Sequence, residues 1–438
     1  MDHASAQELL ALFDQSSGVT TDSRQCGPGR LYFALKGARF DGNQYALEAM
    51  EKGCIAAVVD DPQLTGEGLV HVADGLAALQ DTARAHRDRF RAPVFGLTGS
   101  NGKTTTKELI KSLVGGHLKV HATQGNFNNH IGVPLTLLSM PRDTGFALVE
   151  MGANHQGEIA DLCDIAQPTC GMITNVGLAH LEGFGGVEGV KKGKQELFKH
   201  LASKGGEALV NAQDTDLMAL SDLDGLIRIP YGVSDHPPHA WRNGGGMDGA
   251  ICWSSHPGKD PGTWHGGPAG IPVQLHGAHQ LANINAAIAV AQHFGVPPEL
   301  INRALAGFLP PEQRGETVTT ARNTVIVDCY NANPSSVEST LQAFAAGGHT
   351  GPLAILGDMK ELGTHAASGH QLVRDVARDC GLECWVVGAA FSAHAPADRT
   401  FADMAALTEA LQSEPIAGRT VLLKGSRSMK MEALVQSL

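Results

Sequence analysis

A glycine-rich stretch at residues 96–106 has the composition of a phosphate-binding loop. It lies between a short apolar run typical of a buried strand and a segment with helical apolar spacing. Glycines let backbone N–H groups surround phosphate oxygens, and the helix N-terminus adds partial positive charge. Lys103 adds a full charge, and the Thr104 hydroxyl can hold a magnesium ion. The loop has the shorter Gly-x-x-Gly-Lys-Thr form, because Leu97 occupies the place of the usual first glycine.

An acidic residue, Glu150, ends the apolar strand predicted at 146–151. Ligands of parallel α/β sheets lie at the carboxyl ends of the strands, so this carboxylate is expected near the phosphate loop. A loop at the end of the next strand carries Asn175 and His180 to the same edge. Magnesium takes oxygen ligands and only one or two protein carboxylates, which suits Glu150 beside Thr104. The alternative is an exposed acid at a strand end.

Three further polar stretches have simple structural explanations when they are considered alone. Ser23 and Arg24 lie in a turn-prone segment, where capping explains them equally well. Lys194 belongs to a lysine-rich helical segment, and such runs are usually solvated faces. Asp328 begins the segment 328–334, whose Asn and Pro residues favour a strand-to-helix turn. These alternatives remain open on the residues alone.

The order of predicted elements indicates an α/β protein of three domains. A small α/β unit spans residues 1–75, and a longer alternation of strands and helices at 76–309 predicts a mostly parallel sheet. A proline-rich linker leads to a second alternation at 310–438, expected to form a Rossmann-like domain that has no phosphate loop and ends in a helix at residues 430–437. Residues 234–272 break the pattern and predict loops with short antiparallel strands at the edge of the central domain.

Bulk properties exclude several classes of protein. The chain has 438 residues and a formal net charge of −12, which argues against general nucleic-acid binding. No apolar run approaches the ~20 residues that span a bilayer, and the N-terminus lacks the features of a signal peptide. The eight cysteines show no zinc-site spacing. A cytoplasmic protein with reduced cysteines and no membrane partner is expected.

The order of the motifs along the chain resembles that of the Mur ligases, the ATP-dependent amide-forming enzymes of peptidoglycan precursor synthesis. The motifs that carry this resemblance lie at residues 98–105, 125–135, 150–154, 174–180, 194–198, 328–334, 356–363 and 424–428. The last three are similar to the branch of the family that adds D-alanyl-D-alanine to UDP-N-acetylmuramoyl-tripeptide. The resemblance covers about residues 20 to 432.

The resemblance implies a role for each domain and for individual residues. The first domain would bind the UDP-substrate, the central domain would bind ATP, and the last would complete the site. Catalytic roles fall to Lys103, His180 and Lys194. Substrate-binding positions are Ser23, Arg24, Asn126, Asn128 and Asn129. ATP-binding positions are Gly99, Asn101, Gly102, Lys103, Thr104, Thr105, Asn283, Arg314, Asp328 and Asn331.

Two magnesium sites are also implied, with Thr104, Glu150, His180 and Lys194 as ligands. Lys194 matches the lysine that related ligases carbamylate, which would supply a negative group to the second metal. Where the family usually has His-Asn before the helix that carries Asn283, this chain has His279-Gln280. Gln280 can present the same amide one methylene farther out.

The implied reaction is ligation through an acyl phosphate by a monomeric enzyme that acts on small molecules. The rivals are a sibling ligase that adds an earlier amino acid, a folate polyglutamylating enzyme, and a phosphate-loop ATPase without ligase chemistry. The segments 330–334 and 424–428 argue against the first two. Measuring phosphate release with and without the two substrates distinguishes a ligase from the third rival, the phosphate-loop ATPase.

Overall fold

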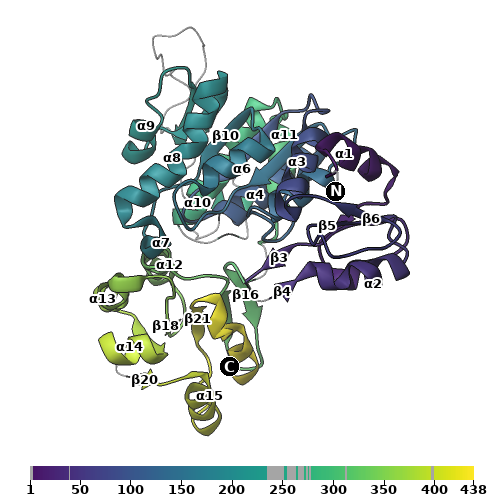
Figure 1. Ribbon diagram of the computed structural model, residues 1–438. Helices are drawn as coiled ribbons and strands as arrows, with labels where there is room; N and C mark the ends of the chain where they lie inside the picture. The colour runs from purple at the N-terminus through teal and green to yellow at the C-terminus, as the bar shows by residue number, and fades with distance from the viewer. Residues whose placement is uncertain are drawn as a thin grey trace.

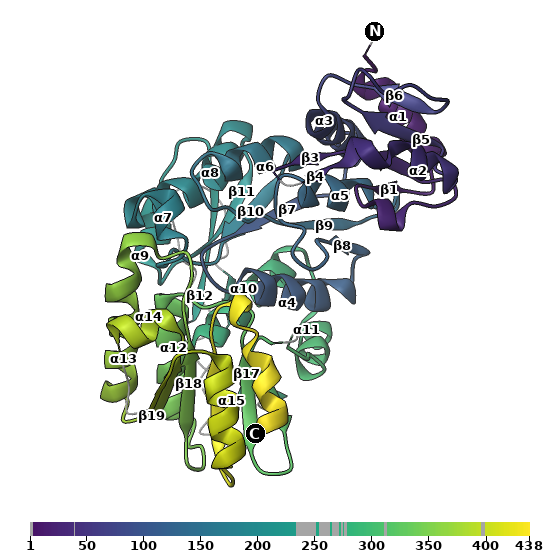
Figure 2. The same ribbon diagram turned by 60° about the horizontal axis from the view of Figure 1, so that its bottom comes forward.

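The computed structural model describes residues 3–38, 40–233, 278–310, 313–395 and 399–438, and four short pieces at 251–253, 263–264, 271–272 and 275. The three largest sheets follow one another along the chain (Figure 1). The N-terminal, central and C-terminal parts of the chain are arranged in series, with the central sheet between the other two (Figure 2). The three-domain α/β architecture expected from the sequence is confirmed.

The N-terminal domain is built on a four-stranded parallel sheet in the order β1-β2-β5-β6. Ser5 and Glu8 form a reciprocal capping box that fixes the start of helix α1. A two-stranded antiparallel ribbon, β3 with β4, extends from this unit. The strands are β1 (Val19–Thr20), β2 (Leu31–Phe33), β3 (Lys36–Gly37), β4 (Phe40–Asp41), β5 (Ala56–Val59) and β6 (Leu69–His71), and the α-helices are α1 (Ala6–Gln15) and α2 (Ala46–Glu51).

The central domain contains a seven-stranded, wholly parallel sheet in the order β13-β12-β11-β10-β7-β9-β8. Strand β7, which leads into the phosphate loop, lies inside the sheet between β9 and β10. The strands are β7 (Val94–Thr98), β8 (Val120–Ala122), β9 (Phe146–Glu150), β10 (Cys170–Ile173), β11 (Glu207–Asn211), β12 (Ile227–Val233) and β13 (Ile251–Trp253).

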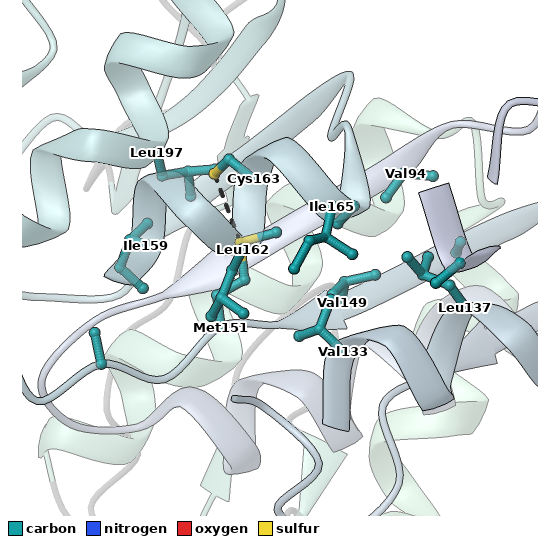
Figure 3. Close-up of a cluster of buried hydrophobic side chains, with 14 of the residues drawn as sticks. Val94, Val133, Leu137, Val149, Met151, Ile159, Leu162, Cys163, Ile165 and Leu197 are labelled. Atoms are coloured by element: carbon teal, nitrogen blue, oxygen red, sulfur yellow. Dashed lines mark hydrogen bonds between the residues drawn. The ribbon is translucent and has the colours of Figure 1, made fainter. Parts of the chain in front are cut away.

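Helices cover both faces of the central sheet, and each face has its own apolar core. One core lies under α3, α5, α6 and α8 and includes Val149, Met151 and Leu162 (Figure 3). The other lies under α4, α10 and α11 and includes Leu97 and Ile288. The helices are α3 (Gly75–Arg87), α4 (Lys103–Gly115), α5 (Gly132–Leu138), α6 (Glu158–Ala166), α7 (Leu181–Phe184), α8 (Val187–Lys204), α9 (Thr215–Leu220), α10 (Ala278–His293) and α11 (Pro298–Ala306).

The C-terminal domain contains a six-stranded sheet in the order β16-β17-β21-β18-β19-β20, parallel except for the edge strand β16. Its strands are β16 (Glu316–Thr319), β17 (Thr324–Asp328), β18 (Leu353–Gly357), β19 (Glu383–Val387), β20 (Arg399–Phe401) and β21 (Thr420–Lys424). Its α-helices are α12 (Pro334–Ala346), α13 (Ala366–Asp379), α14 (Ala389–His394) and α15 (Met404–Ser413).

Two local predictions differ from the structure. Residues 430–437, expected as an α-helix, form the 3-10 helix η5 (Met431–Ser437), which starts after Lys430 in a left-handed conformation. Most of 234–272 lies outside the described residues. Within it, β14 (Thr263–Trp264) and β15 (Ile271–Pro272) pair antiparallel as expected, but β13 is parallel to β12 and extends the central sheet.

Candidate active site

The phosphate loop connects β7 to α4 and needs glycine at two positions. Gly99 and Gly102 have positive φ angles of 147° and 78°. A Cβ atom at Gly102 would lie 2.3 Å from the side-chain oxygen of Asn283, and one at Gly99 would lie 1.9 Å from the Thr174 hydroxyl. Only glycine permits both the backbone angles and these close approaches. The loop is therefore fixed by its neighbours.

The loop after β10 braces the phosphate loop from the side. The Thr174 hydroxyl donates to the backbone carbonyl of Asn101 over 2.6 Å, and the Asn175 amide donates to the same carbonyl over 3.0 Å. The Asn175 side-chain oxygen accepts from the backbone N–H of Asn101 at 3.0 Å. The expectation that Asn175, Glu150 and His180 gather near the loop is confirmed, since all three line one cavity with it.

The lysine of the loop is held inward. Lys103 Nζ donates to the carbonyls of Gly99 at 2.7 Å and Ser100 at 3.2 Å. Burial lowers the pKa of Lys103, while Glu150 opposes that shift. Phosphate oxygens are stronger acceptors than backbone carbonyls, because a charge-assisted hydrogen bond exceeds a neutral one. Lys103 is therefore poised to turn toward an anion in the cavity.

Glu150 is buried at the end of β9, where three side chains meet its carboxylate. The Asn128 amide donates to Oε1 over 2.8 Å, and the Thr104 hydroxyl lies 3.3 and 3.2 Å from the two oxygens. Lys107 Nζ lies 3.6 Å from Oε2. The sequence prediction placed Glu150 beside Thr104, and the structure brings the two together. The sequence prediction did not identify Lys107.

Lys194 is only 1% exposed, on the inner face of α8. Its ammonium lies 5.1 Å from the centre of the Phe184 ring. Burial, and after it the charge of Lys103, lower the pKa of Lys194 to about 7. The solvated-face alternative is therefore wrong for this lysine, although its neighbour Lys192 is exposed. A buried amine that is partly neutral near pH 7 is able to react with carbon dioxide.

The helix α10 presents Asn283 to the phosphate loop. Its side-chain oxygen accepts from the Thr106 hydroxyl over 3.2 Å, and its amide donates to the Gln280 side chain over 2.9 Å. Gln280, at the position where the family pattern differs, therefore orients Asn283. Both residues line the cavity with Thr105.

The C-terminal domain supplies the opposite wall of the cavity. Asp328 and Lys424 are register partners on β17 and β21, and their side chains form an ion pair that buries Lys424. The Thr340 hydroxyl also donates to Asp328 over 3.2 Å. The Arg314 guanidinium lies 3.7 Å from the centre of the Tyr330 ring, a stacking distance. Lys424 and Tyr330 are functional candidates to which the sequence prediction assigned no individual role.

Two cavities meet at this junction between the domains. One has a volume of about 670 Å³ and contains the phosphate loop, Glu150, His180 and Asp328. The other, of about 900 Å³, lies along α4 and includes Lys107 and Arg427. They share Thr104, Asn126, Arg314, Tyr330 and Asn331. An acidic chain thus gathers several cations at one place, as binding of a polyphosphate requires.

The remaining predicted positions divide between this junction and the first domain. Asn126 lines both cavities. Asn129 lines the smaller one, and its side-chain oxygen accepts from the N–H groups of Ile131 and Gly132 at the start of α5. Ser23 and Arg24 form part of a short 3-10 turn capped by Asp22, and neither lines the two cavities. The structure brings the proposed nucleotide groups together with Thr104, Glu150 and His180 around the cavities. Lys194, which is buried against Phe184, lines neither cavity, and the turn at Ser23 lies apart from both.

Comparison with known proteins identifies the family. Residues 15–87 match the Mur ligase family, catalytic domain; residues 97–291 match the Mur ligase middle domain; and residues 313–427 match the Mur ligase, glutamate ligase domain. The chain belongs to the Mur ligase family.

Relatives of this Mur ligase agree along its length. The UDP-N-acetylmuramoyl-tripeptide--D-alanyl-D-alanine ligase of Bacillus subtilis is 33% identical over 96% of this chain and 93% of its own. The protein of the same name from Escherichia coli is 33% identical over the same shares of the two chains.

Solved structures agree as well. MurF from Acinetobacter baumannii has a TM-score of 0.83 and 28% identity, covering 100% of this chain and 99% of its own. MurF ligase from Thermotoga maritima in complex with ADP has a TM-score of 0.81 and 25% identity, covering 97% of both chains.

The donor set suits magnesium better than a tightly ligated transition metal. In the described ranges, no three His, Cys, Asp or Glu side chains come close enough to hold a metal ion. Glu150 and Thr104 instead offer oxygen donors beside the phosphate loop, where phosphate oxygens and water would complete the shell of a bound magnesium ion. His180 pairs with Glu361 across the domain junction, its Nδ1 lying 2.7 Å from Oε2. No described helix is long and apolar enough to cross a membrane.

Proposed function

We propose that this Mur ligase joins D-alanyl-D-alanine to UDP-N-acetylmuramoyl-tripeptide at the expense of ATP, in the cytoplasmic synthesis of peptidoglycan precursors. The observation that carries the proposal is full-length similarity to ligases of that name combined with a phosphate loop facing Asp328 and Arg314 across one cavity. The similarity to an ADP complex supports use of ATP.

In the proposed reaction, the tripeptide carboxylate attacks the γ-phosphorus of ATP, giving an acyl phosphate and ADP. The amine of D-alanyl-D-alanine then attacks the acyl carbon through a tetrahedral intermediate, releasing phosphate as the amide forms. The protein's main contributions are positioning and charge stabilisation. Lys103 and the N–H groups at the start of α4 neutralise phosphate charge. Arg314 faces them from the C-terminal domain.

Nucleotide binding is proposed to use the phosphate-loop residues together with Asn283, Asp328 and Asn331. Asp328 supplies a carboxylate for ribose hydroxyl groups. Its pairing with Lys424 supports this role, because the ion pair fixes the orientation of the carboxylate. The Asn283 side chain lies close to Gly102, where it can contact the nucleotide base or the phosphate loop.

Magnesium is proposed to bind at Glu150 and Thr104, with a second ion near His180 and Lys194. When bound, the metal neutralises the negative charge that gathers around the transferred phosphate. Glu150 would be the direct carboxylate ligand. Lys194, as a carbamate, would present two oxygens and one negative charge in place of an ammonium. The low pKa of Lys194, set chiefly by burial, supports formation of this carbamate.

We further propose domain boundaries near residues 75 and 310, with UDP-substrate recognition by the first domain through Ser23 and Arg24. Asn126, Asn128 and Asn129 would then meet the substrate where it enters the cavity. The enzyme is proposed to act as a monomer.

The experiment that tests this function measures phosphate release and product mass with purified protein. Rapid phosphate release should require ATP, magnesium, UDP-N-acetylmuramoyl-tripeptide and D-alanyl-D-alanine together, and mass spectrometry should detect the pentapeptide product. Release of phosphate without both substrates would indicate a plain ATPase. Product formation with a single amino acid or with a folate would indicate a sibling ligase.

A further inference from the structure

Lys107 is a fully buried lysine that the proposed reaction does not yet use. Its side chain has 0% exposure, on α4 one helical turn beyond Lys103. Lysine is almost never buried completely unless it is paired. Its position among Ile110 and Val114 on the inner face of the helix therefore needs an electrostatic explanation.

The Lys107 ammonium connects three parts of the site. It donates to the carbonyl of Gly125 over 3.2 Å, and it lies 3.3 Å from Glu108 Oε1 and 3.6 Å from Glu150 Oε2. Gly125 begins the loop that carries Asn128, and Asn128 itself donates to the other oxygen of Glu150. One cation therefore holds helix α4, this loop and the end of β9 in a common arrangement.

The carboxylate of Glu150 requires such a partner before any metal binds. Glu150 is 1% exposed, and an unpaired buried carboxylate is strongly disfavoured. The Asn128 amide and the Thr104 hydroxyl are neutral, whereas Lys107 brings a full positive charge. Lys107 also lines the larger cavity beside Thr104, so this charge lies at the edge of the site rather than in a distant core.

We propose that Lys107 is a positioning residue that orients Glu150 and balances its charge until nucleotide and metal arrive together. The inference rests on the proposed magnesium role of Glu150. A cation this close opposes binding of a free divalent ion to the carboxylate. The phosphate groups of a bound nucleotide would offset that opposition. Lys107 thereby favours binding of the metal as its nucleotide complex.

The test measures Mn²⁺ binding to the nucleotide-free protein by electron paramagnetic resonance, alongside turnover with Mg²⁺ and ATP. Lys107→Met should tighten Mn²⁺ binding at least tenfold and lower turnover at least tenfold, because the charge and the loop contact are both lost. Lys107→Arg should keep Mn²⁺ affinity within about threefold of the unchanged protein. Lys119→Met, an exposed lysine paired with Asp143, should change neither.

Unchanged or weaker Mn²⁺ binding in a folded Lys107→Met variant would overturn the proposal, since a merely structural lysine gives that result. If Lys107→Met does not fold, the double variant Lys107→Met/Glu150→Gln should fold, because the buried charges are removed together. Failure of the double variant to regain folding would also refute the pairing. Mn²⁺ binding does not depend on ligation, so a protein without ligase activity would disprove the proposed function separately.

Discussion

The side-chain amide of Asn333 donates to the side-chain oxygen of Asn101 over 2.7 Å, across 232 residues of chain. The Asn101 amide in turn donates to the Ser335 hydroxyl over 2.9 Å. The phosphate loop and the N-terminus of α12 are thus joined directly. Together with the His180–Glu361 pair, these bonds hold the C-terminal domain against the nucleotide cavity.

We expect Asn333→Ser combined with Ser335→Ala to weaken this closure. Serine still caps α12, but it is too short to reach Asn101. Two lost hydrogen bonds of about 1 kcal/mol each shift an open–closed equilibrium by roughly tenfold or more. The KM for ATP should rise, and small-angle scattering should show a larger radius of gyration. Ser413→Ala on α15 is the control. The same KM and radius of gyration for the unchanged protein, the double variant and the control would show that the hydrogen bonds at Asn101 do not hold the domains together.

Lys103→Ala should lower turnover by a factor on the order of 10²–10³, the usual cost of one strong transition-state donor. The melting temperature should change little, because the hydrogen bonds of the Lys103 ammonium within the described ranges go to carbonyls of its own loop. Steady-state kinetics and a thermal melt test both statements. Near-normal ligation by this variant would disprove the assigned role of the loop lysine.

Asp328→Ala should weaken ATP use without altering binding of UDP-tripeptide to the first domain. It should also destabilise the protein, because Lys424 would remain buried without its partner. Asp328→Ala/Lys424→Met should recover much of the stability but not the ATP affinity. Calorimetry and melting curves separate the two effects. Loss of UDP-tripeptide binding with unchanged ATP affinity would show that the domain roles are wrong.

The sequence predicts the parts of this site that depend on local patterns. The phosphate loop follows from a strand, a glycine turn and a helix in order, and Glu150 follows from its place at a strand end. The Asn101–Asn333 contact could not be predicted, because it depends on how two distant domains meet. The burial of Lys194 did leave a signal, since Val190, Leu197 and Leu201 share its helical face. Lys107 left the same signal on α4.

Lys194→Ala should abolish ligation, and added short-chain carboxylic acids should partly restore it. The acid would supply the oxygens that a carbamate otherwise provides to magnesium. Lys192→Ala is the matched control, because Lys192 is exposed on the same helix and should not be required. Retention of most activity by Lys194→Ala would contradict the carbamate role. Turnover as a function of acid concentration is the measurement.

The pH dependence of the protein's stability should reveal the buried charge of Lys194 independently of catalysis. Burial chiefly lowers the pKa of Lys194 from 10.5 to about 7, so between these values the unfolded chain binds more protons than the folded one. The resulting penalty is complete below about pH 7 and disappears as the pH rises toward 10.5. Lys194→Met removes it.

In buffer free of carbon dioxide, Lys194→Met should therefore raise the free energy of unfolding, and the gain should be about 2 kcal/mol larger at pH 7 than at pH 9. Denaturant titrations at the two pH values measure this difference. Lys192→Met should show no such dependence, because that side chain is exposed and loses little hydration on folding. An equal gain at both pH values would mean that Lys194 acts through packing against Phe184 rather than through its buried charge.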